Sequence, residues 1–184
     1  MDRKTKFRTT ALGKPQRGFS MIELLVAVLV MGVGVLGVTG LQLISLQNNQ
    51  DALLRAEGVQ FAYDILDRIR VNPGGGAVPG VAYNGVGLDD VPAAPTDCHA
   101  NNCSPAQMVV FDIAVWKCSL GEFNAEDVCT DLRDDGVLPP TTTQPGLPEG
   151  DGAIAVDGAG VVTITVEWEG FDNQPQTITI TSQG

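Results

Sequence analysis

The chain has 184 residues, of which 22 are acidic and 11 basic, so its formal net charge is −11. Six of the basic residues lie in the first 18 positions, and the rest of the sequence carries five basic and 21 acidic residues. Surfaces that bind nucleic acids begin from clustered lysine and arginine. The acidic remainder therefore argues against a nucleic-acid partner and indicates a soluble, self-repelling surface.

One uninterrupted apolar run, Leu24–Leu41, contains 18 residues and no charge. As a helix it would span about 27 Å, close to the thickness of a bilayer core. The basic residues before it place positions 1–18 in the cytoplasm and the acidic part across the membrane. A secretory signal peptide would have a shorter apolar region, followed by small residues at a cleavage site, which this sequence lacks.

A plain membrane anchor would fit the length of this run but leaves Glu23 unexplained. Its carboxylate lies at the edge of the run, where a charge is unfavourable in lipid and marks a candidate functional site. The six residues from Gly18 to Glu23, with the sequence GFSMIE, separate the basic leader from the apolar run. This arrangement resembles the processing motif of type IV prepilins.

The resemblance implies that a prepilin peptidase cuts after Gly18 on the cytoplasmic side and methylates the new N-terminal amine of Phe19. Glu23 matches the family's glutamate, four residues after the cut. Its expected role is to pair with the N-terminal ammonium of a neighbouring subunit. That pairing would neutralise two charges otherwise stranded in hydrocarbon.

Gly32, Gly34 and Gly37, within the apolar run, have the G-x-G-x-x-G spacing of a dinucleotide-binding loop. That motif needs a preceding strand and a polar mouth for the pyrophosphate, and neither fits a membrane-length helix. We interpret these glycines as sites of close helix packing and local flexibility, each lowering helix propensity by roughly 1 kcal/mol relative to alanine. The same interpretation applies to Gly40, so the candidate packing glycines are Gly32, Gly34, Gly37 and Gly40.

From Gln42 to Val71 the pattern stays helical but becomes amphipathic, with apolar residues at steps of three and four. Pro73 and the glycines after it end the helix. A single helix from about Phe19 to Val71 would be roughly 80 Å long. The alternative is two helices with a break near positions 47–49.

Four cysteines follow, and an even number outside the cytoplasm indicates disulfides. Of the three possible pairings, the local one is favoured because both loops are short: Cys98 with Cys103, and Cys118 with Cys129. The alternative, zinc, does not match the usual ligand spacing. The single histidine, His99, lies in a polar loop that we expect to be exposed. The sequence predicts no metal, no cofactor and no catalytic constellation.

The rest of the head is predicted to be a short helix and an antiparallel sheet. Ser104 opens a capping box before a helix from Pro105 to about Leu120, whose single apolar face includes a buried Trp116. Positions 73–96 are expected to be a loop with one short strand near Val81–Val86. Positions 130–152 are expected to be a solvated loop, and the alternative is a loop that binds calcium through Asp131, Asp134 and Asp135. Alternating residues predict three strands in a meander whose apolar face the N-terminal helix covers, namely Ala153–Val156, Val162–Trp168 and Gln176–Thr181.

Several segments narrow the resemblance to the minor pilin family called type IV pilus modification protein, PilV. They are positions 70–74, 97–98, 103–105, 111–116, 147–150 and 162–168. The resemblance implies an α+β, type IV pilin-like fold, with a long N-terminal helical spine packed on a small antiparallel sheet. The expected divisions are a leader (1–18), a transmembrane or filament-core half-helix (19–41), an amphipathic half-helix (42–72) and a periplasmic head (73–184).

The function implied is structural and not enzymatic: a minor pilin that primes filament assembly and influences piliation, twitching motility and adhesion. Its expected partners are the prepilin peptidase, other minor pilins, the major pilin and the inner-membrane assembly platform. The expected location is the bacterial inner membrane, as a single-pass protein with a periplasmic head, and then the pilus. The alternative is a minor pseudopilin of a type II secretion system, which shares the leader, Glu23 and the spine.

Overall fold

The computed structural model describes residues 18–74, 78–171 and 173–183. The chain divides into two compact units, Met1–Ser45 and Leu46–Gly184. A helix α1, Met21–Val71, contributes to both units, and it begins two residues later than the sequence indicates. The helix is assigned without a break near positions 47–49, so the alternative of two helices is wrong.

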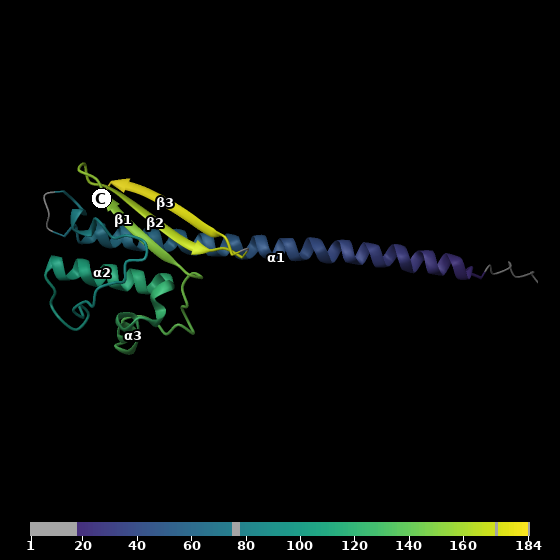
Figure 1. Ribbon diagram of the computed structural model, residues 1–184, viewed down its shortest axis with the longest axis horizontal. Helices are drawn as coiled ribbons and strands as arrows, with labels where there is room; N and C mark the ends of the chain where they lie inside the picture. Colours follow the sequence, from purple (N-terminus) through teal and green to yellow (C-terminus); the bar gives the residue numbers. More distant parts are fainter. Residues whose placement is uncertain (1–17, 75–77, 172, 184) are drawn as a thin grey trace, which may run out of the picture. The chain divides into compact units, whose positions relative to one another are not determined.

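The second unit, which we call the head, combines the last part of α1 with two further helices, two 3-10 helices and a sheet (Figure 1). The elements after α1 are η1 (Val81–Tyr83), α2 (Pro105–Leu120), η2 (Glu122–Ala125), α3 (Asp127–Asp134), β1 (Asp151–Val156), β2 (Val161–Glu169) and β3 (Pro175–Gln183). The expected α+β fold, with a long N-terminal helix and a small antiparallel sheet, is confirmed.

The sheet is a three-stranded antiparallel meander in the order β1-β2-β3. Side chains of β2 alternate between buried and half-buried, with Val162, Ile164 and Val166 fully buried. The Thr163 and Thr165 side chains occupy the opposite face, as the alternation in the sequence predicts. In this central strand, Ile164 pairs with Ile154 of β1 on one side and with Ile180 of β3 on the other.

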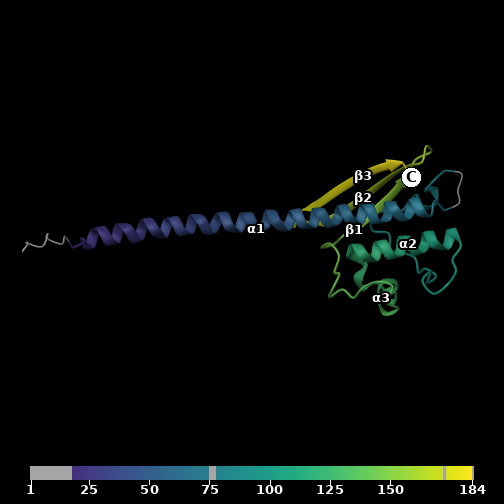
Figure 2. The same ribbon diagram turned by 180° about the vertical axis from the view of Figure 1, so that it is seen from behind.

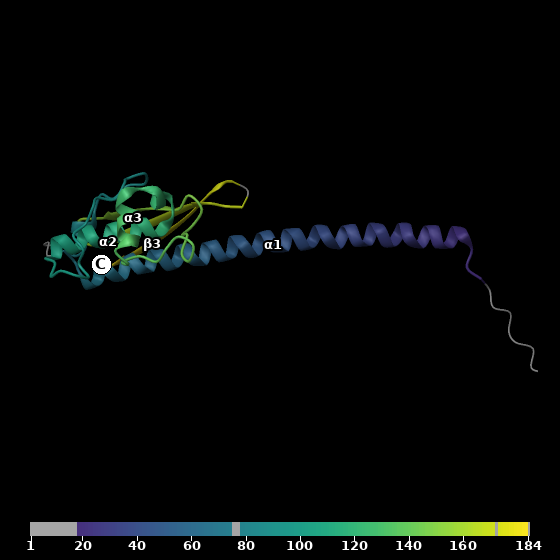
Figure 3. The same cartoon turned by 90° about the horizontal axis from the view of Figure 1, so that it is seen from below.

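The head part of α1 lies against this sheet and beside α2 (Figures 1, 2 and 3). Its buried residues recur at steps of three and four: Gly58, Phe61, Ala62, Ile65, Leu66 and Ile69. Gly58 allows the closest approach, because a Cβ there would lie 3.1 Å from the ring of Trp168. The amphipathic pattern thus selects the helix face that covers the sheet.

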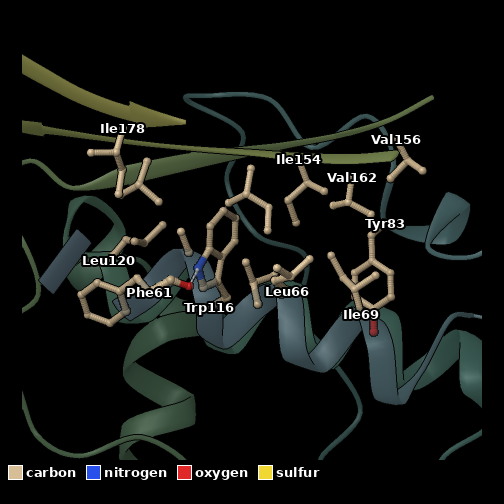
Figure 4. Close-up of a cluster of buried hydrophobic side chains, with 14 of the residues drawn as sticks. Phe61, Leu66, Ile69, Tyr83, Trp116, Leu120, Ile154, Val156, Val162 and Ile178 are labelled. Atoms are coloured by element: carbon tan, nitrogen blue, oxygen red, sulfur yellow. Dashed lines mark hydrogen bonds between the residues drawn. The ribbon is translucent and has the colours of Figure 1, made fainter. Parts of the chain in front are cut away.

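Trp116 lies at the centre of this first core, between α1 and the sheet (Figure 4). Its indole Nε1 donates a hydrogen bond to the carbonyl of Phe61 at 3.0 Å, so the buried polar atom of the ring is satisfied. The neighbouring strand fits only because it carries Gly152 there, since a Cβ would lie 2.4 Å from the indole. The predicted burial of Trp116 is confirmed.

The predicted capping box at the start of α2 is also confirmed, with Ser104 and Gln107 satisfying each other's backbone N–H groups. The prediction of one apolar face on this helix is wrong. One side of α2 packs on the first core, and another side forms a second core with α3. That second core contains Phe111, Ala114, Val115, Cys118, Phe123, Cys129, Leu132 and Leu138.

Two loop assignments from the sequence need correction. The expected strand at Val81–Val86 is replaced by η1, because Gly80 and Gly85 adopt positive φ on either side of it, and only Val86 forms a bridge, to Ile154. The expected loop from position 130 begins inside α3, whose Cys129 and Leu132 are buried one helical turn apart in the second core.

Candidate functional site

The predicted processing site lies immediately before the first turn of α1. Gly18, Phe19 and Ser20 are exposed and not helical, and 85% of the Phe19 surface is accessible. The carbonyl of Ser20 accepts hydrogen bonds from the backbone N–H groups of Glu23 at 3.0 Å and Leu24 at 3.2 Å. The Gly18–Phe19 peptide bond therefore lies in an exposed, non-helical segment, and the helix starts only after it.

Glu23 is the acidic residue of the first turn of α1. A carboxylate is favourable there because the N-terminal N–H groups of a helix carry partial positive charge. In the sequence it is also the only charged residue between Arg17 and Asp51. A partner ammonium approaching this end of the helix would meet a single, isolated negative charge.

Every residue from Gly18 to Ser45 is exposed, including the whole apolar run. By length and composition α1 is apolar enough to cross a membrane, and its most apolar 18-residue window is 0% buried within the structure. Such a surface is stable only when lipid or other apolar helices cover it. This part of the chain is compatible with membrane anchoring and with burial in a filament.

The four glycines of the run present flat patches on this exposed helix. A Cβ added at Gly32, Gly34, Gly37 or Gly40 would meet nothing within 4 Å. Small residues on a lipid-facing helix allow a second helix to approach closely. Their role in packing between subunits stays a prediction, since it depends on a neighbouring helix.

In the head, two disulfides join Cys98 to Cys103 and Cys118 to Cys129. The first closes a surface loop next to His99, which is exposed and lies against the ring of Phe111. The second is buried and ties the last turn of α2 to α3. The pairing is the local one of the three that four cysteines allow.

A buried ion pair, which the sequence analysis missed, connects several elements of the head. The ammonium of Lys117 lies 2.5 Å from Asp151 and donates to the carbonyl of Gly87 at 2.9 Å. Asp151 also accepts the backbone N–H groups of Asp89 and Gly152, each at 2.6 Å. Both side chains of the pair are at least 95% buried. The pair therefore fastens α2 to β1 and to the 87–89 loop.

Carboxylate oxygens of Asp89, Glu122 and Asp151 lie within 4.8 Å of one another. Such a trio has the chemistry of a cation site, but the Lys117 ammonium already occupies its buried end. The arrangement is better described as an internal cation held by carboxylates. It gives the cluster a role in holding the head together.

Glu122 illustrates the electrostatic strain in this cluster, and replacing it by glutamine is expected to stabilise the head at pH 7. Desolvation, followed by repulsion from Asp151 and Asp89, raises the pKa of Glu122 above 4.5. A raised carboxyl pKa means that the folded state holds its proton more tightly, so stability falls as pH rises above about 4.5. Because Glu122 is largely exposed, the gain should be a few tenths of a kcal/mol at most.

Denaturant unfolding of wild type and Glu122→Gln at pH 7 and pH 3.5 measures this effect. The difference should vanish at the lower pH, where the wild-type carboxyl is protonated. Glu126→Gln, which removes an exposed acid just beyond η2, is the matched control. Equal stability of all three proteins at pH 7 would contradict the assignment.

A second buried network joins α1, η1 and α2. The Tyr83 hydroxyl donates to Asp112 at 2.7 Å, and Arg68 donates to the same carboxylate at 3.2 Å. Burial, followed by the bond to Asp112, raises the pKa of Tyr83. The signal that could have revealed both networks is the scarcity of basic residues after position 18, since Arg68 and Lys117 are two of only five.

Two protein-family models match this chain. The model described as prokaryotic N-terminal methylation motif matches residues 13–39, and the model described as type IV pilin Tt1218 matches residues 40–114. The first contains the Gly18–Phe19 bond and Glu23, and the second ends within α2, before Trp116 and Lys117. No curated protein and no solved structure matches the chain.

Proposed function

We propose that this chain is a type IV pilin and, within that class, a minor pilin that is cut at Gly18–Phe19 and built into a type IV pilus. Two adjoining family matches, to residues 13–39 and 40–114, support the class. The methylation motif implies processing by a prepilin peptidase and assembly with other pilins. That the chain is a minor pilin of the PilV family, and that it joins the partners named below, is our proposal.

The single observation that carries the proposal is the exposed first part of α1. It presents a long apolar surface with Glu23 as its one charge, and the cleavage point precedes it directly. A head held on such a segment is anchored in the inner membrane before assembly. Afterwards, other pilin helices replace the lipid around the same surface.

The proposed role of Glu23 follows from cleavage. Cutting after Gly18 creates an ammonium on Phe19, and both charges then lie at the end of an apolar helix. Each is unfavourable alone in hydrocarbon, so a subunit is added most favourably when its ammonium meets the Glu23 carboxylate of a neighbour. Methylation of Phe19 leaves this positive charge in place.

The head supports a specialised rather than a bulk subunit. The Tt1218 match ends at Ala114, whereas α3, the buried disulfide and the sheet lie beyond it. In the proposed role the protein joins other minor pilins and the major pilin on the inner-membrane assembly platform, primes the filament, and thereby affects twitching motility and adhesion. Deleting its gene should reduce piliation. Normal piliation with defective exoprotein secretion would instead favour the type II pseudopilin.

Gly18→Ala is expected to slow processing by about tenfold or more, because one added methyl group at a cleavage site is discriminated by 1–3 kcal/mol. Intact mass of the chain from membranes that contain a prepilin peptidase measures the outcome. Wild type should begin at Phe19 and carry one extra methyl group. Gly40→Ala, the same change in the exposed helix, is the control and should be processed normally. Cleavage beyond position 41 in the wild type would overturn the proposed class of processing.

A further inference from the structure

The two edges of the sheet differ in how their backbone groups are used. At the β1 edge, Ile154 donates to the carbonyl of Val86 at 2.8 Å and accepts from Gly85 at 3.2 Å. The amide of Val156 donates to the side chain of Asn84 at 2.7 Å. This edge is thereby closed by the 84–87 loop, which prevents another strand from adding there.

The outer edge of β3 is open. The backbone N–H and C=O groups of Ile154 point away from β2, so Ile154 and Ile164 form a non-hydrogen-bonded pair. In an antiparallel ladder the groups of Ile164 then point toward β3, which makes Ile164 and Ile180 a hydrogen-bonded pair. The bond from Gly170 to Gln174 at 2.9 Å fits the same alternation. The groups of Thr177, Thr179 and Thr181 therefore point outward, and no other backbone group among the described residues bonds to them.

The composition of β3 suits pairing and lacks the usual protection. Its residues, PQTITITSQ, carry no charge in a chain with a net charge of −11, and the only proline is the first residue of the strand. Exposed edge strands normally avoid adding another strand by means of charges, prolines or bulges. Alternating threonine and isoleucine has high strand propensity, and Ile180 is only partly buried.

We propose that the β3 edge is an interaction surface whose occupant is the same strand of a second copy of this chain. The sequence from Thr177 to Thr181 reads the same in both directions about Thr179. A twofold antiparallel pair centred there sets Thr179 against itself, Thr177 against Thr181, and Ile178 against Ile180 of the second copy. All outward backbone groups of the three threonines are then hydrogen-bonded, isoleucine meets isoleucine on the core side, and no like charges oppose each other.

The geometry also indicates which copies pair. In the head, α1 and β3 run in the same general direction (Figures 1 and 2). A twofold axis reverses that direction in the partner, whereas subunits added head to tail along one filament all point the same way. The pair therefore joins copies from two filaments or two membranes. This last step rests on the proposed function, while the pairing itself rests on the head alone.

The test uses the full chain in detergent, with the oligomeric state measured by sedimentation as a function of concentration. Thr179→Pro removes the central outward N–H without touching the ladder to β2. It should weaken the dimer about ten- to a hundredfold, because two hydrogen bonds worth up to about tenfold each are lost. Thr179→Lys should act similarly by placing like charges opposite each other. Thr165→Lys, on the same face but one strand inward, is the control and should leave the dimer intact.

Thr179→Cys supplies a cross-linking test of register, since all four native cysteines are in disulfides. A short bis-maleimide should join two Thr179→Cys chains and should fail with Thr165→Cys. A dimer unaffected by Thr179→Pro would mean that the helices alone associate, and would overturn the proposal. A chain that remains monomeric, or that pairs only with a different pilin, would overturn it as well. None of these outcomes depends on peptidase processing, so they are separable from the test of the proposed function.

Discussion

Replacing Lys117 by methionine is expected to lower the free energy of unfolding of the head by about 3–5 kcal/mol, the usual effect of leaving one charge of a buried pair without its partner. Methionine matches the length of the lysine stem, so the loss reports the charge and not the volume. Unfolding is followed by the fluorescence of Trp116 and Trp168, which are both buried in the first core. The full chain in detergent is the appropriate sample.

The expected effect is large because Lys117 is the only positively charged partner of Asp151 among the residues that the structure describes. The carboxylate is 95% buried and starts β1, and the ammonium also lies 5.0 Å from the centre of the Phe123 ring. Without the ammonium, the carboxylates of Asp89 and Glu122 remain within 4.8 Å of that of Asp151, and their mutual repulsion increases. The start of β1 and the 87–89 loop should loosen together.

Two controls isolate this interaction. Arg70→Ala breaks an exposed ion pair with Asp67 and an exposed hydrogen bond to the Ser182 hydroxyl, and should cost only about 1 kcal/mol. Combining Lys117→Met with Asp151→Asn removes both charges and keeps one of the two oxygens that accept the backbone N–H groups of Asp89 and Gly152. The double variant should therefore recover part, but not all, of the loss. If Lys117→Met and Arg70→Ala had equal effects, the buried pair would not have the role described.

Glu23→Ala is expected to leave processing intact and to reduce the amount of this protein in sheared filaments by about tenfold or more, since an ammonium without a counterion in an apolar interior costs several kcal/mol. Glu23→Gln keeps the size and polarity of the side chain but not its charge, and should fail to the same degree. The measurement is the ratio of filament protein to processed protein in the membrane.

Asp51→Ala is the matched control, because it removes the next carboxylate along α1 from an exposed position. It should be incorporated like wild type. Equal filament content for wild type and Glu23→Ala would contradict the pairing of Glu23 with the Phe19 ammonium. Normal incorporation of Glu23→Gln alone would show that hydrogen bonding, rather than charge, is what assembly requires.

The parts of the fold that the sequence predicts well are those governed by regular periodicity. Steps of three and four residues predict the head part of α1, and strict alternation predicts β2 and its buried face. The capping box at Ser104 sets the start of α2 within one residue. In each case a local pattern and the tertiary packing favour the same structure, so short-range information is sufficient.

The parts that were missed depend on contacts between distant segments. Eight residues of α3 form a helix because Cys129 is tied to Cys118 and Leu132 enters the second core. The sequence favours that cysteine pairing, but the burial of Leu132 within a polar, acidic stretch depends on tertiary packing. A lysine is normally a surface residue, but Lys117 is buried because it pairs with Asp151, which lies 34 positions away in the sequence. η1 depends on positive φ at Gly80 and Gly85, which the Gly- and Pro-rich segment permits but does not specify.

The division of the head into two cores has a practical consequence for labelling the protein. α2 contributes side chains to both, and α3 packs only in the second core, apart from the sheet. The threonines at positions 141–143 are exposed, in a turn whose backbone bonds are made within positions 140–144. A short epitope or fluorophore inserted there should be tolerated, and would report where along a filament each copy resides without altering the surfaces through which the subunits join.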